Sequence, residues 1–207
     1  MTLNKIFIPL SAAALVLAGN VTASVEPYDE ASAMLDYDEQ ETLLFMREEE
    51  KLARDVYHTL YDVWGNPVFA AIEESEKRHT EAIQDQLEKY GLEDPVVDDS
   101  TGAFYNTDLQ EKYYLLVDKG QQSELEALMV GAYIEELDMI DLLEAIEETD
   151  EVSLDRTYGN LLRGSRNHLR AFVSRIEELT GEIYKAQLLD QDSVDAIVSQ
   201  PVETGRS

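Results

Sequence analysis

The chain contains no cysteine among its 207 residues. Disulfide bonds, thiolate metal ligands and a cysteine nucleophile are therefore excluded. Basic residues are also scarce, since 16 Lys and Arg stand against 44 Asp and Glu and the formal net charge is −28. Proteins bind the phosphates of nucleic acids mainly through Lys and Arg, so we expect no nucleic-acid partner. An acidic surface of this kind favours solubility and hydrated cations.

The apolar run near the N-terminus is too short to cross a bilayer comfortably. It covers residues 6–18, a span of 13 residues, whereas a membrane-spanning helix needs about 20. The run follows Lys5 and precedes small residues around Ala23, which is the pattern of a secretory signal peptide. We therefore predict a signal peptide over residues 1–23, export to the periplasm or the extracellular space, and no stable membrane insertion after cleavage. An uncleaved membrane anchor is the alternative.

Most of the remaining sequence has the periodicity of amphipathic helices. Residues 24–37 are acidic and weakly patterned, and we expect a flexible lead-in there. Four long helices are predicted after it, over residues 38–64, 67–90, 123–148 and 154–180. Gly65 and Pro67 separate the first pair, and Gly91 suits the end of the second helix. Because short connections join the first two and the last two helices, each pair should form an antiparallel hairpin.

The connection between these two hairpins is long and contains a short helix, predicted over residues 107–118. Two hairpins joined by one long crossover have the ferritin-like topology. The sequence thus predicts an all-α, ferritin-like four-helix bundle over residues 38–184, followed by a short helix and a frayed tail over 185–207. An up-down bundle with the extra helix packed across one end is the rival arrangement.

Polar residues interrupt the apolar seam of each long helix. Seam positions recur at alternating steps of three and four. The polar residues on them near the middle of each helix are Glu50, Glu76, His79, Glu135, Ser165 and His168. Buried carboxylates are costly unless they are paired or bind a metal, and no Arg or Lys occupies these seams. We therefore predict a metal site with the ligands Glu50, Glu76, His79, Glu135 and His168. Two alternatives are a solvent-facing Glu50 within its acidic run and a hydrogen-bonded core histidine at position 168; His58 is interpreted as a surface or packing residue.

Two stretches of the chain resemble the ligand helices of rubrerythrin-type proteins. Glu50 is followed by Ala53, Arg54 and Tyr57 at the same offsets as in those proteins, and residues 75–79 resemble their second ligand helix. More closely, the chain is similar over residues 38–180 to the ferritin-like family called "domain of unknown function 2202". The matching stretches are residues 47–57, 90–95 and 164–172. The resemblance implies a ferritin-like fold and, because the family is uncharacterised, no established reaction.

The resemblance to dimetal proteins also implies that Glu50, Glu76, His79 and Glu135 are ligands. The last helix departs from their pattern, because Ser165 stands where those proteins place a carboxylate. Asp138, one turn beyond Glu135, is a candidate substitute ligand. Tyr57 is expected to fill the core or to donate a hydrogen bond near the site. One ion beside Glu50, Glu76 and His79, with a weaker or empty second position, is the alternative to a di-iron centre.

Three functions fit these observations. The first is a metal-dependent oxidoreductase that holds one or two ions, with iron favoured over manganese or zinc, and oxidises Fe(II) with oxygen or peroxide. The second is a non-enzymatic protein of the cell envelope in which an ion fixes the structure or the acidic surface binds cations. The third is a vestigial site in a module that binds an envelope partner. No catalytic residue is assigned, and a homodimer is the assembly considered.

Overall fold

The protein is described here by a computed structural model that covers residues 34–205. This part of the chain forms six helices and no strand, which confirms the predicted all-α class. The helices are α1 (Tyr37–Trp64), α2 (Pro67–Tyr90), α3 (Thr107–Gly120), α4 (Glu124–Glu148), α5 (Val152–Thr180) and α6 (Gln191–Val198). The predicted signal peptide, residues 1–23, and most of the predicted lead-in, residues 24–37, lie outside the described residues.

Local capping explains where the first two helices begin and end. The Asp36 carboxylate accepts a hydrogen bond from the amide of Glu39, whose side chain accepts one in return, so a full capping box starts α1. Gly65 ends the helix with a φ of 64°, a left-handed conformation that glycine adopts without a steric penalty. Asn66 then caps α2, and Pro67 occupies its first turn. The break that the sequence predicted between the two helices is therefore explained by local residues that end α1 and start α2.

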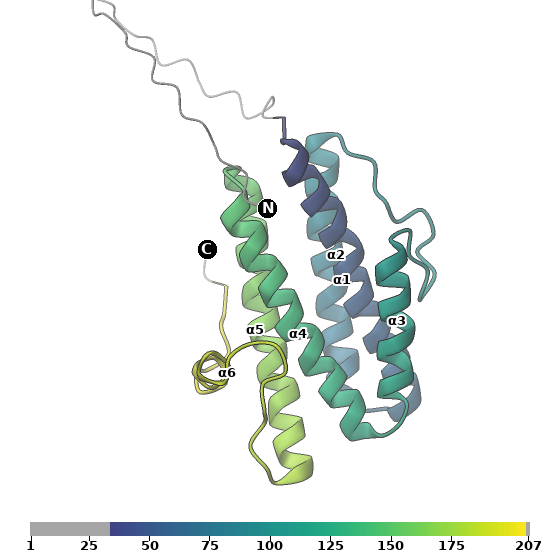
Figure 1. The fold of residues 1–207 in the computed structure, drawn as a ribbon, viewed down its shortest axis with the longest axis vertical. Helices are drawn as coiled ribbons and strands as arrows, with labels where there is room; N and C mark the ends of the chain where they lie inside the picture. The colour runs from purple at the N-terminus through teal and green to yellow at the C-terminus, as the bar shows by residue number, and fades with distance from the viewer. Residues whose placement is uncertain (1–33, 206–207) are drawn as a thin grey trace, which may run out of the picture. The chain divides into compact units, whose positions relative to one another are not determined.

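The four long helices contact one another in a closed cycle. α1 packs against α2, α2 against α5, α5 against α4, and α4 against α1, while α3 lies against α1 and α4 (Figure 1). Three aromatic rings from three of these helices meet in the core. The Phe172 ring centre lies 5.3 Å from that of Tyr57 and 5.6 Å from that of Phe69. These ring contacts pack α1, α2 and α5 together next to the polar residues described below.

The long connection from α2 to α3 is fastened to α1 by buried charged groups. Arg47 binds Asp94 at 3.0 Å, and the Lys51 ammonium donates to the carbonyl of Ser100 at 3.0 Å. The Glu48 carboxylate accepts hydrogen bonds from the backbone amides at positions 105 and 106. Charged residues of α1 that face away from the centre of the helix cluster thus bind the connection between α2 and α3.

The end of the chain differs from the frayed tail that the sequence predicted. Glu203 forms ion pairs with Arg166 at 2.6 Å and with Arg170 at 2.8 Å, and its backbone amide donates to Asn167. These contacts fix residues after α6 against the outer face of α5. The prediction missed them because a polar tail contains no sign of the distant Arg pair that it meets.

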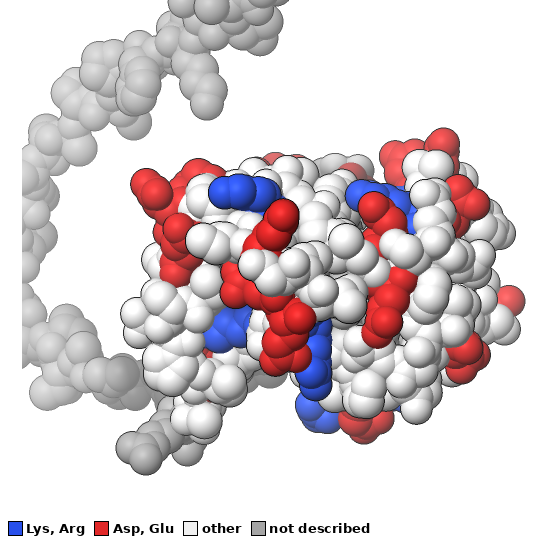
Figure 2. Space-filling model, turned by 90° about the horizontal axis from the view of Figure 1, so that it is seen from below, with Lys and Arg blue, Asp and Glu red and all other residues white. Residues whose placement is uncertain are grey.

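No described helix is both long enough and apolar enough to span a membrane. Acidic side chains are spread over the face shown in Figure 2, with a few Lys and Arg between them. This distribution agrees with the large excess of Asp and Glu in the sequence.

Candidate metal centre

The middle turns of the four long helices bring carboxylate and imidazole groups together in the interior. α1 contributes Glu50, α2 contributes Glu76 and His79, α4 contributes Glu135, and α5 contributes His168. These are the five residues that the sequence analysis named as ligands. They form two groups that could each hold a metal ion, and in each group three ligand atoms lie within 4.8 Å of one another.

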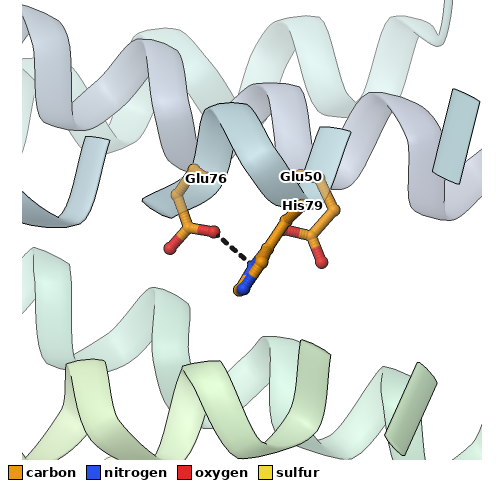
Figure 3. A group of neighbouring side chains, drawn as sticks. All are labelled: Glu50, Glu76 and His79. Atoms are coloured by element: carbon orange, nitrogen blue, oxygen red, sulfur yellow. Dashed lines mark hydrogen bonds and ion pairs between the residues drawn. The ribbon is translucent and has the colours of Figure 1, made fainter. Parts of the chain in front are cut away.

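The first group consists of Glu50, Glu76 and His79. The His79 Nδ1 atom lies 2.7 Å from Oε2 of Glu76 and 3.2 Å from Oε2 of Glu50. Figure 3 shows all three side chains directed into the space between the α1–α2 pair and the opposite helices. The spacing of Glu76 and His79 by one helical turn places both on the same face of α2.

The second group consists of Glu76, Glu135 and His168. The His168 Nδ1 atom lies 2.8 Å from Oε1 of Glu76 and 3.3 Å from Oε2 of Glu135. Glu76 therefore takes part in both groups and presents a different carboxylate oxygen to each histidine. A carboxylate in this position can connect two ions.

Three further polar residues adjoin the two groups. The Tyr57 hydroxyl donates a hydrogen bond of 2.5 Å to Oε1 of Glu135. The Ser165 hydroxyl donates to the Asp138 carboxylate. Tyr57 is thus both part of the core and a hydrogen-bond donor to the site. Ser165, which stands where a carboxylate ligand was expected, orients the Asp138 carboxylate instead.

Burial and close charges perturb the pKa values of the site. Burial raises the pKa of Glu50 to about 7, against the opposing effect of His79. Burial alone would also raise the pKa of Glu76, but the positive charges of His168 and His79 outweigh it and hold this pKa below its usual range. Although burial disfavours the charged form of His168, the carboxylates of Glu76 and Glu135 raise its pKa to about 10. Protons on the two imidazoles therefore compensate the carboxylates when no other cation is bound.

Lys and Arg do not provide this compensation. The Lys51 side chain is fully buried one residue from Glu50, yet its ammonium is bound to Asp55 at 2.5 Å. Arg47 is similarly bound to Asp94. Even two protonated histidines leave part of the charge of Glu50, Glu76, Glu135 and Asp138 unbalanced if all four ionise, so the site favours a multivalent cation.

The donor set fits a metal ion by its geometry as well as its charge. Glu50 Oε1 and His168 Nδ1 are buried and have no hydrogen-bond partner of suitable geometry, although His168 Nδ1 lies close to two carboxylates. Two ligand atoms at about 2.1 Å from one ion, at angles of about 90–110°, lie about 3.0–3.4 Å apart. The nitrogen–oxygen distances of 2.7–3.3 Å within the two groups are close to this range. A mixed carboxylate and imidazole set suits iron, manganese or zinc.

Gly164 makes room for the His79 ring. A Cβ atom at this position would lie 2.5 Å from Nε2 of His79 and 2.6 Å from its Cε1. The ring therefore rests against the α5 backbone on one side while its Nδ1 faces the carboxylates of Glu50 and Glu76 on the other. The absent side chain was not recognised from the sequence, because its importance depends on a contact between α2 and α5.

Glu49 and Asp141 were not predicted as part of a site. All three residues of the run Glu48, Glu49 and Glu50 are buried, so the run is not a solvated acidic surface. Burial raises the pKa of Glu49 well above its usual range, and the nearby Asp141 and Asp138 raise it further. The i, i+3 spacing of Asp138 and Asp141 was a usable signal that both lie on one face of α4. His58 is partly exposed and lies 3.3 Å from Glu73, as expected of a surface residue.

Comparison with known proteins identifies the family. A family model described as "Uncharacterized protein domain (DUF2202)" matches residues 39–201. The uncharacterized protein MJ0754 of Methanocaldococcus jannaschii is 47% identical over 168 residues, which cover 81% of this chain and 90% of that protein. The crystal structure of hypothetical protein MJ0754 from Methanococcus jannaschii is similar with a TM-score of 0.80 at 45% identity, over 83% of this chain and 98% of that one. The chain belongs to the DUF2202 family.

Proposed function

We propose that this DUF2202 protein is an exported, ferritin-like metal-binding protein with a two-ion carboxylate–histidine centre that oxidises Fe(II) with oxygen or peroxide. Export rests on the signal-peptide pattern of residues 1–23. The reaction rests on the donor set and its interior position.

The directions of the helices support the ferritin-like bundle. Contacts such as Tyr57 with Glu135 and Glu76 with His168 join helices that run antiparallel, because residues later in one helix meet residues earlier in its neighbour. α2 and α4 must then run parallel. A parallel pair needs a connection that returns along the length of the helices, and α3 lies in that connection beside α1 and α4 (Figure 1).

The observation that carries the two-ion centre is the position of Glu76 between two histidines. One of its oxygens faces His79 and the other faces His168. Glu50 completes the first group and Glu135 the second. Each group thus has two carboxylates and one imidazole, and Glu76 is common to both.

The surrounding residues orient the ligands. Tyr57 holds one oxygen of Glu135 and leaves the other directed at His168. Ser165 holds Asp138, which lies one turn from Glu135 and belongs to neither three-ligand group. Bound iron would supply one-electron exchange between the ferrous and ferric states. The carboxylates would balance the added positive charge of the ferric state.

Single substitutions separate the two groups in a metal-binding experiment. The wild-type protein, freed of metal and then dialysed anaerobically against Fe(II) or Mn(II), is expected to hold two ions by elemental analysis. Glu135→Gln should reduce this number to one, because it alters the second group alone. Glu76→Gln should weaken both sites, because it alters the shared ligand. Glu81→Gln, an exposed change on the same helix, is the control and should retain both ions.

The same samples test the reaction and its alternatives. Oxygen consumption and a new ferric absorbance after Fe(II) addition are expected for the wild type and not for Glu76→Gln. A single bound ion without oxygen consumption would refute the oxidase and favour a structural ion. No bound metal in the wild type would refute the centre altogether and favour a vestigial site.

A further inference from the structure

Glu49 is a buried carboxylate for which the two-ion centre has no use. It is 4% exposed, and no N–H or O–H group of the described residues donates a hydrogen bond to either of its carboxylate oxygens. The side chain within hydrogen-bonding reach of Glu49 is another carboxylate, Asp141. Buried polar groups are almost always paired, and a buried carboxylate without partners is costly. The neighbouring residues Glu48 and Glu50 both have partners. Two neighbouring carboxylates can be paired only by a shared proton or by a cation held between them.

Two other carboxylates lie beside Glu49. The charges of Asp141 and Asp138 both act on it, and the charge of Lys112 offsets only part of their effect. Asp138 in turn interacts with Glu50 and Glu135 of the metal centre. Asp141, Glu49 and Asp138 thus form a continuous series of carboxylates that ends at the centre.

The outer end of this series opens into a cleft. Asp141 lines a cleft of about 780 Å³ between α1, α4 and the crossover, and no Lys or Arg is among its lining residues. The acidic residues that line it are Glu41, Glu48, Asp141, Glu144 and Glu148. A concave surface with charges of one sign concentrates counter-ions from solution.

We propose that Asp141, Glu49 and Asp138 form a relay that passes divalent cations from this cleft to the two-ion centre. The proposal rests on the proposed function, because a relay requires a centre to fill. Among the described residues, only the two groups of the centre bring three ligand atoms within 4.8 Å of one another. Asp141, Glu49 and Asp138 form no such group, so an ion there would be held by fewer ligands at a time, which suits brief binding of an ion in transit.

Stopped-flow mixing of the metal-free protein with Co(II) tests the relay. The visible absorbance of bound Co(II) reports the rate of loading, and its final amplitude reports the number of ions bound. Glu49→Gln and Asp141→Asn should each slow loading about tenfold, at the lower end of the effects that charged clefts have on association rates, and leave the final amplitude unchanged. High salt should slow loading of the wild type and of all variants, because screening weakens the attraction of the cleft for cations. Glu81→Gln removes an exposed acid elsewhere and should load at the wild-type rate.

The outcomes distinguish the relay from the centre. Normal loading rates in both variants, with a normal wild-type amplitude, would refute the relay and leave the centre intact. A reduced final amplitude in Glu49→Gln would also refute it, because Glu49 would then be a resident ligand. Failure of the wild type to bind Co(II) would refute both proposals. Asp141 is only half-buried, so Asp141→Asn keeps the test decisive if Glu49→Gln loses its circular dichroism signal.

Discussion

Gly164→Ala should weaken metal binding without unfolding the protein. The new methyl group would lie 2.5 Å from Nε2 of His79, and ordinary contacts of a Cβ atom begin at 3.4 Å. The imidazole must therefore move by about 0.9 Å. It cannot move directly away, because its Nδ1 already lies 2.7 Å from Glu76 and 3.2 Å from Glu50. The ring must turn, so that its Nδ1 would no longer face an ion held by Glu50 and Glu76.

The expected size of the effect follows from these distances. Loss of ligand orientation typically reduces metal affinity about 10–100-fold, and we expect a reduction in this range for the ion bound by His79. Alanine favours a helix interior over glycine by about 0.5–1 kcal/mol, which offsets part of the cost of the steric contact. Isothermal titration calorimetry with Mn(II) measures the affinity, and urea unfolding of the metal-free protein measures stability.

Gly159→Ala is the matched control. It lies on the same helix, and a Cβ atom there would have no heavy atom within 4 Å, so it should raise stability and leave affinity unchanged. In a His79→Ala background the effect of Gly164→Ala on metal affinity should disappear, since the steric partner is gone. Wild-type affinity in Gly164→Ala with His79 present would refute either the position of the ring or its role as a ligand.

Two further predictions concern pH and the C-terminal tail. The pKa of His168 is raised to about 10 in the folded protein, from about 6.5 when unfolded, so the folded state holds the extra proton between these values. The metal-free protein should lose stability as the pH rises from about 6.5 to 10. Urea unfolding at several pH values measures this loss. The loss should be smaller in His168→Gln and in the metal-bound protein. Glu203→Gln should release the tail from Arg166 and Arg170 and cost up to about 1 kcal/mol, because the pair is partly exposed. Hydrogen exchange of residues 199–205 should accelerate while metal binding is retained; unchanged exchange would show that the ion pairs do not hold the tail.

The helices could be predicted because their signals are local. Gly65, Pro67 and Gly91 act within one or two turns of where they stand, and the predicted bounds of the second helix agree with the observed Pro67–Tyr90. The periodicity of each helix also selected Glu50, Glu76, His79, Glu135 and His168 as interior positions. A helix has a fixed number of residues per turn, so the face on which a side chain lies can be read from the sequence.

Contacts between helices could not be read in the same way. The run of Glu48, Glu49 and Glu50 puts three identical residues on different faces of α1, and only the packing assigns each its surroundings. Glu48 accepts hydrogen bonds from backbone amides just before α3, Glu50 lies beside His79, and Glu49 lies near the carboxylates of α4. The three residues are all Glu, but their environments differ because the groups that surround each of them come from distant segments of the chain.

The sequence by itself determined the all-α class, the extents of the long helices and the presence of acidic and histidine residues on their buried faces. The tertiary structure alone decided that one carboxylate, Glu76, lies between two histidines and that Gly164 leaves space for one of them. The physical reason is the range of the forces involved. Helix formation depends on neighbours within a few residues, whereas a metal centre depends on distances between four helices that only their packing sets.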